Sequence, residues 1–310
     1  NVAVVGSGPA GMTAALYAAR AGLSVAVFER MGPGGQMTQT ERLDNYPGFA
    51  EGVDAFELSF AMASQVERFG AERVSDEVVD LNVNDVKKLL TCASGAQYSA
   101  RAIIVATGAE PRELGVPGEA ELRGRGVSYC ATCDGGFFRG KVAVVVGGGN
   151  TAVGDALYLS RICEKVYVVH RRDAFRADAL YLSALSELSN VELVLNSTVE
   201  AIRPTTDGEA PMPHVESILV RDRNTGDERV VNTDAVFIAV GTTPRSNVLK
   251  AAGVALNEAG YAIAGESGAT NVPGVFVAGD VREKPLRQVI TAASDGANAA
   301  TAAFEYLNLD

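Results

Sequence analysis

The same order of segments occurs twice in this chain: a short apolar segment, a glycine-rich turn and an alanine-rich segment. Residues 2–5 form an apolar run typical of a buried strand, a glycine-rich turn follows, and residues 12–21 have the composition of a helix. A second apolar run at 24–28 completes a strand–helix–strand unit. The same order returns over 142–169. The pattern therefore predicts two similar α/β units.

Three later apolar runs indicate how these units are connected. Residues 103–108 and 237–241 each read as a buried strand that ends in glycine, one for each unit. A further strand at 274–280 has no glycine-rich turn ahead of it, so it must return to the first sheet. We therefore expect an α/β fold of two Rossmann-like nucleotide-binding domains, the second inserted in the first. The expected boundaries are 1–113 and 245–310 for the first domain, and 114–244 for the second.

Segments of alternating polarity predict β-meander insertions in both domains. They lie at 73–83, 86–92 and 97–104 in the first domain, and at 191–202, 214–221 and 228–232 in the second. The turns expected at Asp207-Gly208 and Thr225-Gly226 carry no recognisable chemistry. The chain is expected to cross between the domains near 112–117 and 243–247, where Pro, Gly or Thr are frequent. Two such linkers can act as a hinge.

Composition and charge narrow the class of protein. With 310 residues, 47% of them hydrophobic, the chain is long enough for two globular domains that each bury a core. Lys plus Arg number 27 against 38 Asp plus Glu, and the resulting net charge of -11 gives no support for binding nucleic acid. No stretch approaches the roughly 20 apolar residues that span a bilayer, so we expect no membrane association.

The cysteines fall into two groups. Four in the whole chain are too few for a secreted disulfide scaffold, and this indicates the reducing cytoplasm. Cys92 and Cys163 stand alone in apolar stretches and are expected to be buried for packing. Cys130 and Cys133 are separated by only two residues, which keeps the sulfurs close enough for a reversible disulfide. Neither of the two histidines lies at ligand spacing from this pair, so no metal site is expected.

The first glycine-rich turn is a candidate dinucleotide site. In Gly6-Ser7-Gly8-Pro9-Ala10-Gly11, the three glycines allow a tight turn, the approach of a pyrophosphate and close packing of helix on strand. Glu29 ends the following strand, where a carboxylate can accept hydrogen bonds from a ribose diol. This position suits an unphosphorylated adenosine ribose, as in FAD or NAD.

The second turn, Gly147-Gly148-Gly149-Asn150-Thr151-Ala152, is followed by basic residues instead of an acid. Arg171, Arg172 and Arg176 come after the equivalent strand, and their guanidinium groups suit a ribose 2′-phosphate. This difference points to NADPH. The alternative is an ordinary solvated basic turn, with Asp173 as a charge partner.

Asp280 closes the last core strand and has two possible roles. A carboxylate at such a strand end can bind a sugar-like hydroxyl, and the ribityl chain of a flavin carries one. The alternative is a structural cap for the segment that begins after Pro285. A dithiol between two dinucleotide sites implies an electron relay.

Taken in order, these motifs resemble those of the low-molecular-weight, bacterial-type thioredoxin reductases. The resemblance runs from end to end, and the dithiol placed before the second glycine-rich turn is its most specific part. It rests on Gly6–Gly11, Gly34-Gly35-Gln36, Asn45-Tyr46-Pro47-Gly48, Ala106-Thr107-Gly108, Cys130-Ala-Thr-Cys133-Asp134-Gly135, Gly147–Ala152, residues 170–177, Gly279-Asp280 and Arg287-Gln288-Val289-Ile290.

The resemblance implies a homodimeric flavoenzyme, a thioredoxin-disulfide reductase in which electrons pass from NADPH to FAD, to the Cys130–Cys133 disulfide and to thioredoxin, with rotation between the domains. It implies that Cys133 lies against the flavin, that Cys130 attacks the substrate disulfide, and that Asp134 is the acid catalyst. The implied FAD contacts are Gly6, Ser7, Gly8, Pro9, Ala10, Glu29, Gly35, Gln36, Asn45, Asp280, Arg287, Gln288 and Val289. The implied NADPH contacts are Gly149, Asn150, Thr151, Arg171, Arg172 and Arg176.

Some positions depart from the common pattern of that family, namely Gly154, Thr242 and a longer loop at 204–213. Three rival functions are distinguishable. A flavin-dependent oxidase of small dithiols need not bind NADPH, and the arginine cluster argues against it. A reductase feeding a peroxide-removing partner is often built with a thioredoxin-like region ahead of the flavin domain, which these residues lack. A redox-sensing binding protein would turn over slowly with NADPH and every disulfide partner.

Overall fold

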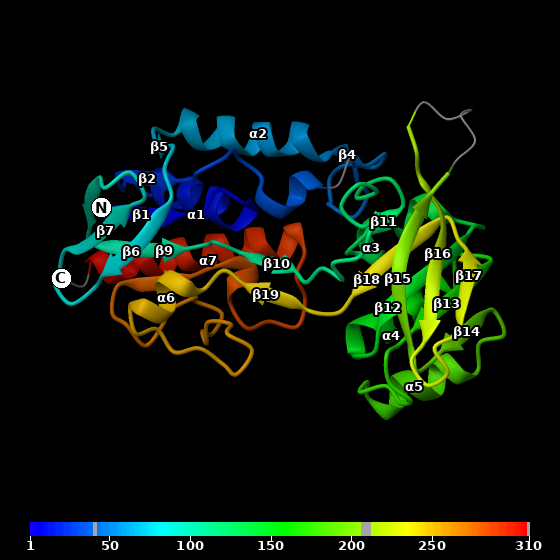
Figure 1. The fold of residues 1–310 in the computed structure, drawn as a ribbon. Coiled ribbons are helices and arrows are strands. Elements are labelled where there is room, and N and C mark those ends of the chain that lie inside the picture. The colour runs from blue at the N-terminus through cyan, green and yellow to red at the C-terminus, as the bar shows by residue number, and fades with distance from the viewer. Residues whose placement is uncertain (40–41, 206–211, 309–310) are drawn as a thin grey trace. The chain divides into compact units, whose positions relative to one another are not determined.

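The computed structural model describes residues 1–39, 42–205 and 212–308 of the chain (Figure 1). The chain divides into two compact units. Unit 1 comprises Asn1–Glu110 and Thr243–Asp310, and unit 2 comprises Pro111–Thr242. The second unit is therefore an insertion in the first. At the two crossings, β10 (Ala109–Pro111) and β19 (Thr242–Pro244) pair as a two-stranded sheet.

Unit 1 is built on a parallel sheet of five strands in the order β20-β9-β1-β2-β5. Its strands are β1 (Val2–Val5), β2 (Val25–Phe28), β5 (Glu72–Val74), β9 (Ala102–Val105) and β20 (Val275–Val277). The central strands are continuous apolar runs because both faces of the sheet are covered. The late strand β20 pairs with β9, which confirms that it returns to the first sheet.

Different layers cover the two faces of this sheet. On one face, Val2 and Val4 pack with α1 (Pro9–Arg20), α2 (Ala55–Arg68) and α7 (Val289–Asn308). Ala3 and Val5 point to the other face, where they pack against a three-stranded meander, since successive strand residues alternate in direction. The remaining elements of unit 1 are η1 (Gly35–Gln39), β3 (Arg42–Leu43), β4 (Val53–Asp54), β6 (Val78–Asn82), β7 (Lys88–Cys92), β8 (Gln97–Ala100), α6 (Asn247–Ala251) and η3 (Gly279–Val281).

Unit 2 repeats this plan. Its parallel sheet has the order β11-β18-β12-β13-β14, with helices on one face and the meander β15-β16-β17 on the other. Its elements are β11 (Val127–Ser128), α3 (Ala131–Asp134), η2 (Gly135–Phe138), β12 (Val142–Gly147), α4 (Asn150–Leu159), β13 (Lys165–Val169), α5 (Ala179–Ser186), β14 (Val191–Val194), β15 (Ser197–Pro204), β16 (Val215–Asp222), β17 (Glu228–Asn232) and β18 (Ala235–Ala239). The expected α/β architecture with two similar units is confirmed.

The expected meander segments need three corrections. Residues 73 and 74 belong to β5, which pairs with β2 in the parallel sheet and is not part of the meander. Residues 191–194 form β14, which pairs with β13 in the parallel sheet and is not part of the meander. Residues 102–104 likewise belong to β9 and not to the meander strand β8. In each of these places the predicted segment contains residues of two strands, which belong to different sheets. The expected turn at Asp207-Gly208 lies outside the described residues.

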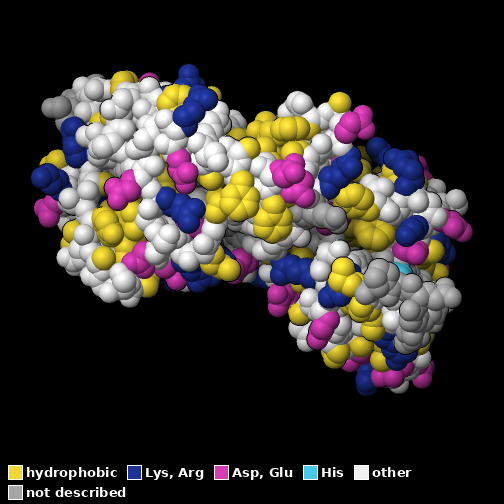
Figure 2. Space-filling view, turned by 90° about the horizontal axis from the view of Figure 1, so that it is seen from above, with side chains coloured by type: hydrophobic (Ala, Val, Ile, Leu, Met, Phe, Trp, Pro, Cys, Tyr) yellow, Lys and Arg dark blue, Asp and Glu magenta, His cyan; other side chains and the backbone are white. Residues whose placement is uncertain are grey.

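The two isolated cysteines are buried, and the surface carries charges of both signs. Cys92 and Cys163 are buried with free thiols, as expected for packing residues, and burial raises the pKa of each, that of Cys163 to about 11. No helix among the described residues is long and apolar enough to cross a membrane. On the face shown in Figure 2, acidic and basic side chains are interspersed, and neither sign forms a continuous patch there.

Candidate active site

Cys130 and Cys133 form a disulfide in unit 2, with their Cα atoms 5.3 Å apart. Cys130 follows the short strand β11, and Cys133 lies in the single turn of α3. The turn brings the two sulfurs together because the backbone N–H groups of Cys133 and Asp134 both donate to the Cys130 carbonyl oxygen, at 3.2 and 3.1 Å. The disulfide expected from the sequence spacing is therefore confirmed.

Ser128 holds Asp134 beside the disulfide turn. Its buried hydroxyl donates to Asp134 Oδ2 at 2.6 Å and accepts the backbone N–H of Cys130 at 3.1 Å. One side chain therefore fixes both the carboxylate and the backbone of the first cysteine. Sequence reasoning did not identify Ser128, although a hydroxyl two residues before a redox cysteine is a usable signal.

A second support of the redox turn is the buried carboxylate of Glu119, which the sequence analysis also missed. Its Oε1 accepts from the Leu114 N–H and the Tyr129 hydroxyl, both at 2.9 Å. Its Oε2 accepts from the N–H groups of Gly115 and Val116, at 2.7 and 3.4 Å. Glu119 thus ties the segment that enters unit 2 to the residue directly before Cys130.

The first glycine-rich turn in unit 1 has the conformation that a nucleotide loop needs. Gly6 has φ +102°, and a Cβ there would lie 2.5 Å from the Ala106 carbonyl oxygen. A Cβ on Gly11 would lie 1.9 Å from the Gly6 carbonyl oxygen. Gly8 differs, because nothing lies within 4 Å of a Cβ placed there. The turn is therefore crowded on the protein side and open at the N-terminus of α1, where Pro9 and Ala10 begin the helix.

Glu29 lies at the end of β2, next to this turn. Its Oε2 accepts from both the N–H and the hydroxyl of Ser7, each at 3.0 Å, and its Oε1 accepts from the Met31 N–H at 3.1 Å. A carboxylate has about four acceptor sites, so Glu29 can still accept from a ribose hydroxyl. The structure therefore brings Glu29 and Ser7 together, as a shared nucleotide site requires.

One further segment of unit 1 approaches the turn, and elsewhere in the unit two more of the expected contact residues pair with each other. The Gly34 N–H donates to the Ser7 carbonyl oxygen at 2.8 Å, and a Cβ on Gly35 would lie 3.4 Å from the Cα of Gly8. The next residue, Gln36, is exposed in η1. The Asn45 side chain donates to Gln288 Oε1 at 2.9 Å, although these residues are 243 positions apart.

Asp280 fits a ligand hydroxyl better than a helix cap. Its Oδ1 is buried and has no hydrogen-bond partner among the described residues. Burial raises the pKa of this carboxyl group, and the nearby cations Lys284 and Arg287 only partly offset this. The helix after Pro285 is α7, which begins only at Val289, whereas Asp280 lies in η3. An unused buried acceptor of this kind is suited to a hydroxyl donor from a bound group.

A buried ion cluster fixes the backbone at Asp280. Asp295 on α7 accepts from the Gly279 N–H at 3.0 Å, from both Nε and Nη2 of Arg282, and from Lys284 Nζ at 2.7 Å. Although burial opposes it, these hydrogen bonds lower the pKa of Asp295. Nearby, the Arg287 guanidinium lies 4.2 Å from the centre of the Tyr261 ring, and its buried Nε has no hydrogen-bond partner among the described residues.

The second glycine-rich turn in unit 2 is also open at a helix N-terminus. A Cβ on Gly147 would lie 2.4 Å from the Ala239 carbonyl oxygen, whereas nothing lies within 4 Å of one on Gly149. Asn150 exchanges two hydrogen bonds with Asp178, at 2.8 and 2.9 Å, which joins the start of α4 to the start of α5. The neighbouring Thr151 is exposed. This turn therefore has the same crowded and open sides as the first.

The arginines after β13 form an exposed turn around a buried histidine. The His170 ring stacks on Phe175 with centroids 5.2 Å apart, and it occupies the space that a Cβ on Gly148 would need. Burial and the surrounding guanidinium groups lower the pKa of His170. The Arg176 N–H donates to the Gly148 carbonyl oxygen at 2.8 Å, which closes the turn onto the glycine loop. The side chains of Arg171, Arg172 and Arg176 are exposed.

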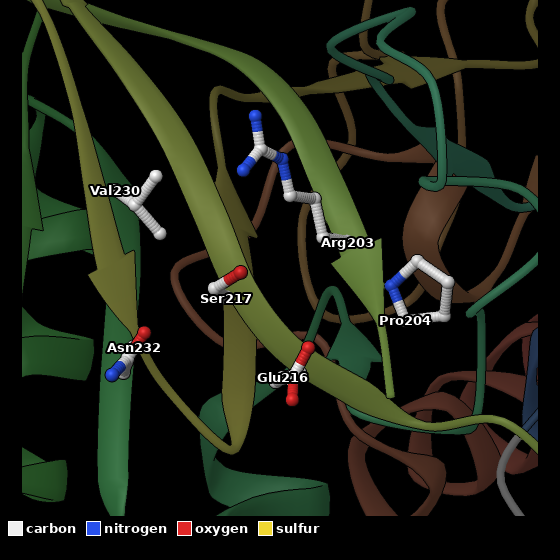
Figure 3. A pocket seen from close by; sticks show the side chains of 6 residues that line it. All are labelled: Arg203, Pro204, Glu216, Ser217, Val230 and Asn232. Carbon is white, nitrogen blue, oxygen red and sulfur yellow. The ribbon is translucent and has the colours of Figure 1, made fainter. Parts of the chain in front are cut away.

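Two cavities lie on the surface of the described residues. One of about 520 Å³ is lined by residues 44–50 and includes Asn45, one of the expected contact residues. The other, of about 680 Å³, lies on the meander of unit 2 and contains none of the expected site residues (Figure 3). It is lined by Arg203, Pro204, Glu216, Ser217, Val230 and Asn232. Among the described residues, no group of three or more His, Cys, Asp or Glu could hold a metal ion.

Comparison with known proteins gives a consistent result. A family model described as pyridine nucleotide-disulphide oxidoreductase matches residues 1–296. A thioredoxin reductase of Bacillus subtilis is 44% identical over 308 residues, which covers 99% of this chain and 94% of that protein. A thioredoxin reductase of Listeria innocua is also 44% identical, with coverage of 99% and 93%. The crystal structure of a thioredoxin reductase from Streptococcus pyogenes has a TM-score of 0.90 at 40% identity, with coverage of 100% and 98%.

Proposed function

The chain belongs to the bacterial-type thioredoxin reductases of the pyridine nucleotide-disulphide oxidoreductase family, and from this premise we propose that it uses NADPH and FAD to reduce thioredoxin. The observation that carries the proposal is the Cys130–Cys133 disulfide, set in the same unit as an open glycine-rich turn and an exposed arginine cluster. A reversible dithiol and a site for a phosphorylated nucleotide are the two ends of such a relay.

When bound, the two cofactors supply hydride transfer from nicotinamide to flavin and the delivery of two electrons to the protein disulfide. Overall, NADPH, one proton and the Cys130–Cys133 disulfide are converted to NADP⁺ and two thiols. The dithiol then exchanges with the thioredoxin disulfide, which becomes a dithiol while Cys130–Cys133 is oxidised again. We assign attack on thioredoxin to Cys130, and to Cys133 the position against the flavin.

Each thiol–disulfide exchange needs a proton to reach the departing sulfur. Asp134 suits this role because Ser128 keeps its carboxylate within the disulfide turn at 2.6 Å. The same hydroxyl holds the backbone of Cys130, so the acid and the attacking residue keep a constant relation to each other. We therefore propose Asp134 as the acid catalyst and Ser128 as its positioning residue.

Unit 1 is the proposed FAD site. Two observations support it: the unused buried acceptor of Asp280 fits a ribityl hydroxyl, and Glu29 fits an adenosine ribose diol. The proposed contacts are Gly6, Ser7, Gly8, Pro9, Ala10, Glu29, Gly35, Gln36, Asn45, Asp280, Arg287, Gln288 and Val289.

Unit 2 is the proposed NADPH site. The open N-terminus of α4 suits the pyrophosphate, and the exposed guanidinium groups suit the 2′-phosphate, which NADH lacks. The proposed contacts are Gly149, Asn150, Thr151, Arg171, Arg172 and Arg176.

We also propose that unit 2 rotates against unit 1 during turnover, because the disulfide and the nicotinamide must each reach one flavin. The paired strands β10 and β19 carry both crossings and can absorb the motion. A verified cross-link between the units that still permits full turnover would exclude this rotation.

Two further properties are proposed. Phe56 and Phe60 lie one turn apart on α2 and are 53% and 60% exposed, which supports a homodimer formed through unit 1. Light scattering should show a dimer for the wild type and a monomer for the variant in which both residues are changed to serine. A monomeric wild type would contradict the proposal. The family membership and the small number of cysteines support a cytoplasmic location, which fractionation of cells can check.

The proposed function is tested by anaerobic reduction of the bound flavin, followed by absorbance. NADPH should reduce the flavin at low concentration and NADH only at much higher concentration. The Cys133→Ser variant should keep this flavin reduction but lose reduction of thioredoxin, because the first step does not involve the disulfide. A variant that binds FAD normally yet is not reduced by NADPH would contradict the proposed order of electron transfer.

A further inference from the structure

The arginine turn after β13 is held from two sides. On one side, the Arg176 backbone closes onto the glycine loop, as described above. On the other side, the arginine turn contacts the turn that follows β16. There the Arg223 side chain donates from Nη1 to the Arg171 carbonyl oxygen at 2.7 Å. Arg223 lies 52 positions from Arg171, and neither the sequence motifs nor the family resemblance includes it.

Asn196 completes this contact through the backbone. Its N–H donates to the Arg172 carbonyl oxygen at 3.0 Å, and its own carbonyl oxygen accepts from the Arg223 N–H at 2.7 Å. Asn196 has φ +51° and is the one residue other than glycine with positive φ among those described. Asparagine tolerates this left-handed conformation better than most residues. The hydrogen bonds therefore close a ring through Arg171, Arg172, Asn196 and Arg223.

Arg223 forms no ion pair with any carboxylate of the described residues. Within the described part of the chain, no carboxylate forms an ion pair with Arg171, Arg172, Arg176 or Arg223, and all four side chains are exposed. Arg221, two residues earlier, shows the contrast, because it pairs with Glu200 and Glu228. A cluster of guanidinium groups without carboxylate partners is a site for an anion.

We propose that Arg223 is a positioning and specificity-determining residue for the 2′-phosphate of NADPH. This inference rests on the proposed function, because it assigns the arginine cluster to that phosphate. Arg223 acts in two ways. It fixes the backbone from which the Arg171 and Arg172 side chains extend, and it adds a fourth positive charge beside that turn.

The test compares Arg223→Gln with Arg229→Gln in the complete, FAD-loaded protein. Arg229 is also exposed and lies on β17, where it contacts Glu192 instead of the arginine turn. We expect Arg223→Gln to raise the KM for NADPH about two- to fivefold, the upper part of the range for a solvent-exposed charge–charge contact, with kcat unchanged. The KM for NADH should not change, and Arg229→Gln should leave both constants as in the wild type.

Calorimetric binding of 2′,5′-ADP and of 5′-AMP provides a readout without turnover. Arg223→Gln should weaken binding of 2′,5′-ADP by a similar factor and leave 5′-AMP binding unchanged, because only the first probe carries a 2′-phosphate. Arg223→Lys should restore part of the affinity, since it keeps the charge but not the planar contact to the Arg171 carbonyl. Equal weakening of both probes, or no change in either, would overturn the inference.

Arg171→Ala separates this inference from the proposed function. If Arg171→Ala lowers the preference for NADPH over NADH and Arg223→Gln does not, the arginine site stands and the role of Arg223 is wrong. If neither variant changes the preference, the assignment of the whole cluster to the 2′-phosphate fails. Asn196→Ala is a second variant, expected to weaken 2′,5′-ADP binding through the backbone ring without removing a charge. Asn196→Gly, which tolerates positive φ, should bind as the wild type does.

Discussion

Replacement of Glu119 by glutamine should destabilise unit 2 strongly, although it changes a single atom type. Both carboxylate oxygens of Glu119 are occupied by donors: Leu114 and Tyr129 on Oε1, and Gly115 and Val116 on Oε2. Glutamine replaces one oxygen with an NH₂ group, so two of these donors would face another donor. Because Glu119 is buried, at 3% exposure, water replaces the lost acceptor only in part.

The magnitude follows from the contacts that are lost. A hydrogen bond to a charged group contributes about 1.5–3 kcal/mol, and the fourth contact, at 3.4 Å, contributes less. Loss of one strong and one weak contact, together with the charge, should cost about 2–4 kcal/mol of unfolding free energy. Tyr129→Phe removes only one contact and should cost about 1–2 kcal/mol. Glu121→Gln removes the same charge from an exposed neighbour and should change stability by less than about 0.5 kcal/mol.

Urea unfolding followed by circular dichroism measures these differences, and amide hydrogen exchange locates them. In Glu119→Gln, the amides of Leu114, Gly115 and Val116 should exchange faster than in the wild type. A loss below about 0.5 kcal/mol, or a larger loss in Tyr129→Phe than in Glu119→Gln, would refute the reasoning.

The same contact predicts an alkaline transition. Burial, together with the hydrogen bond to Glu119 and its charge, raises the pKa of Tyr129 above the ordinary value of 10.0. A raised pKa in the folded state means that the stabilisation is complete below pH 10.0 and is lost as the pH rises above it. Ultraviolet titration should show Tyr129 ionising at a lower pH in Glu119→Gln.

Two other predictions concern one residue in each unit, Asp280 in unit 1 and Asp155 in unit 2. Asp280→Ala should weaken FAD binding about 10- to 100-fold, because the ligand would lose a charged acceptor, while the FAD-free protein is not destabilised; fluorescence titration of the apoprotein measures the first and thermal unfolding the second. Burial raises the pKa of Asp155 on α4 from the ordinary value of 3.8 to about 7, so the stability of the folded protein falls progressively as the pH rises from 3.8 to about 7. Asp155→Asn should therefore unfold at a higher temperature than the wild type at pH 8 but not at pH 4. If the variant and the wild type had the same melting temperature at pH 8 as well as at pH 4, this would be contradicted.

The amino-acid sequence alone was enough for the central strands of the two parallel sheets, the two glycine-rich turns and the redox pair. Continuous apolar runs such as residues 102–105 are typical of parallel strands covered on both faces, and this holds wherever they lie in the chain. The spacing of Cys130 and Cys133 is equally local, since two intervening residues can bring the sulfurs together within one turn. The same applies to Gly6 and Gly147, where a side chain would collide with a neighbouring carbonyl oxygen.

Pairings between distant residues were decided only by the tertiary structure. Polarity indicated a strand at 191–194 but not its partner, and packing beside β13 placed it in the parallel sheet. The contacts of Asn45 with Gln288 and of Arg223 with Arg171 join segments that no local pattern connects. A hydrogen bond needs its two atoms within about 3 Å, and for distant residues that separation is set by the packing of whole elements. The sequence therefore identified the chemistry of the site, and the fold selected the residues that position it.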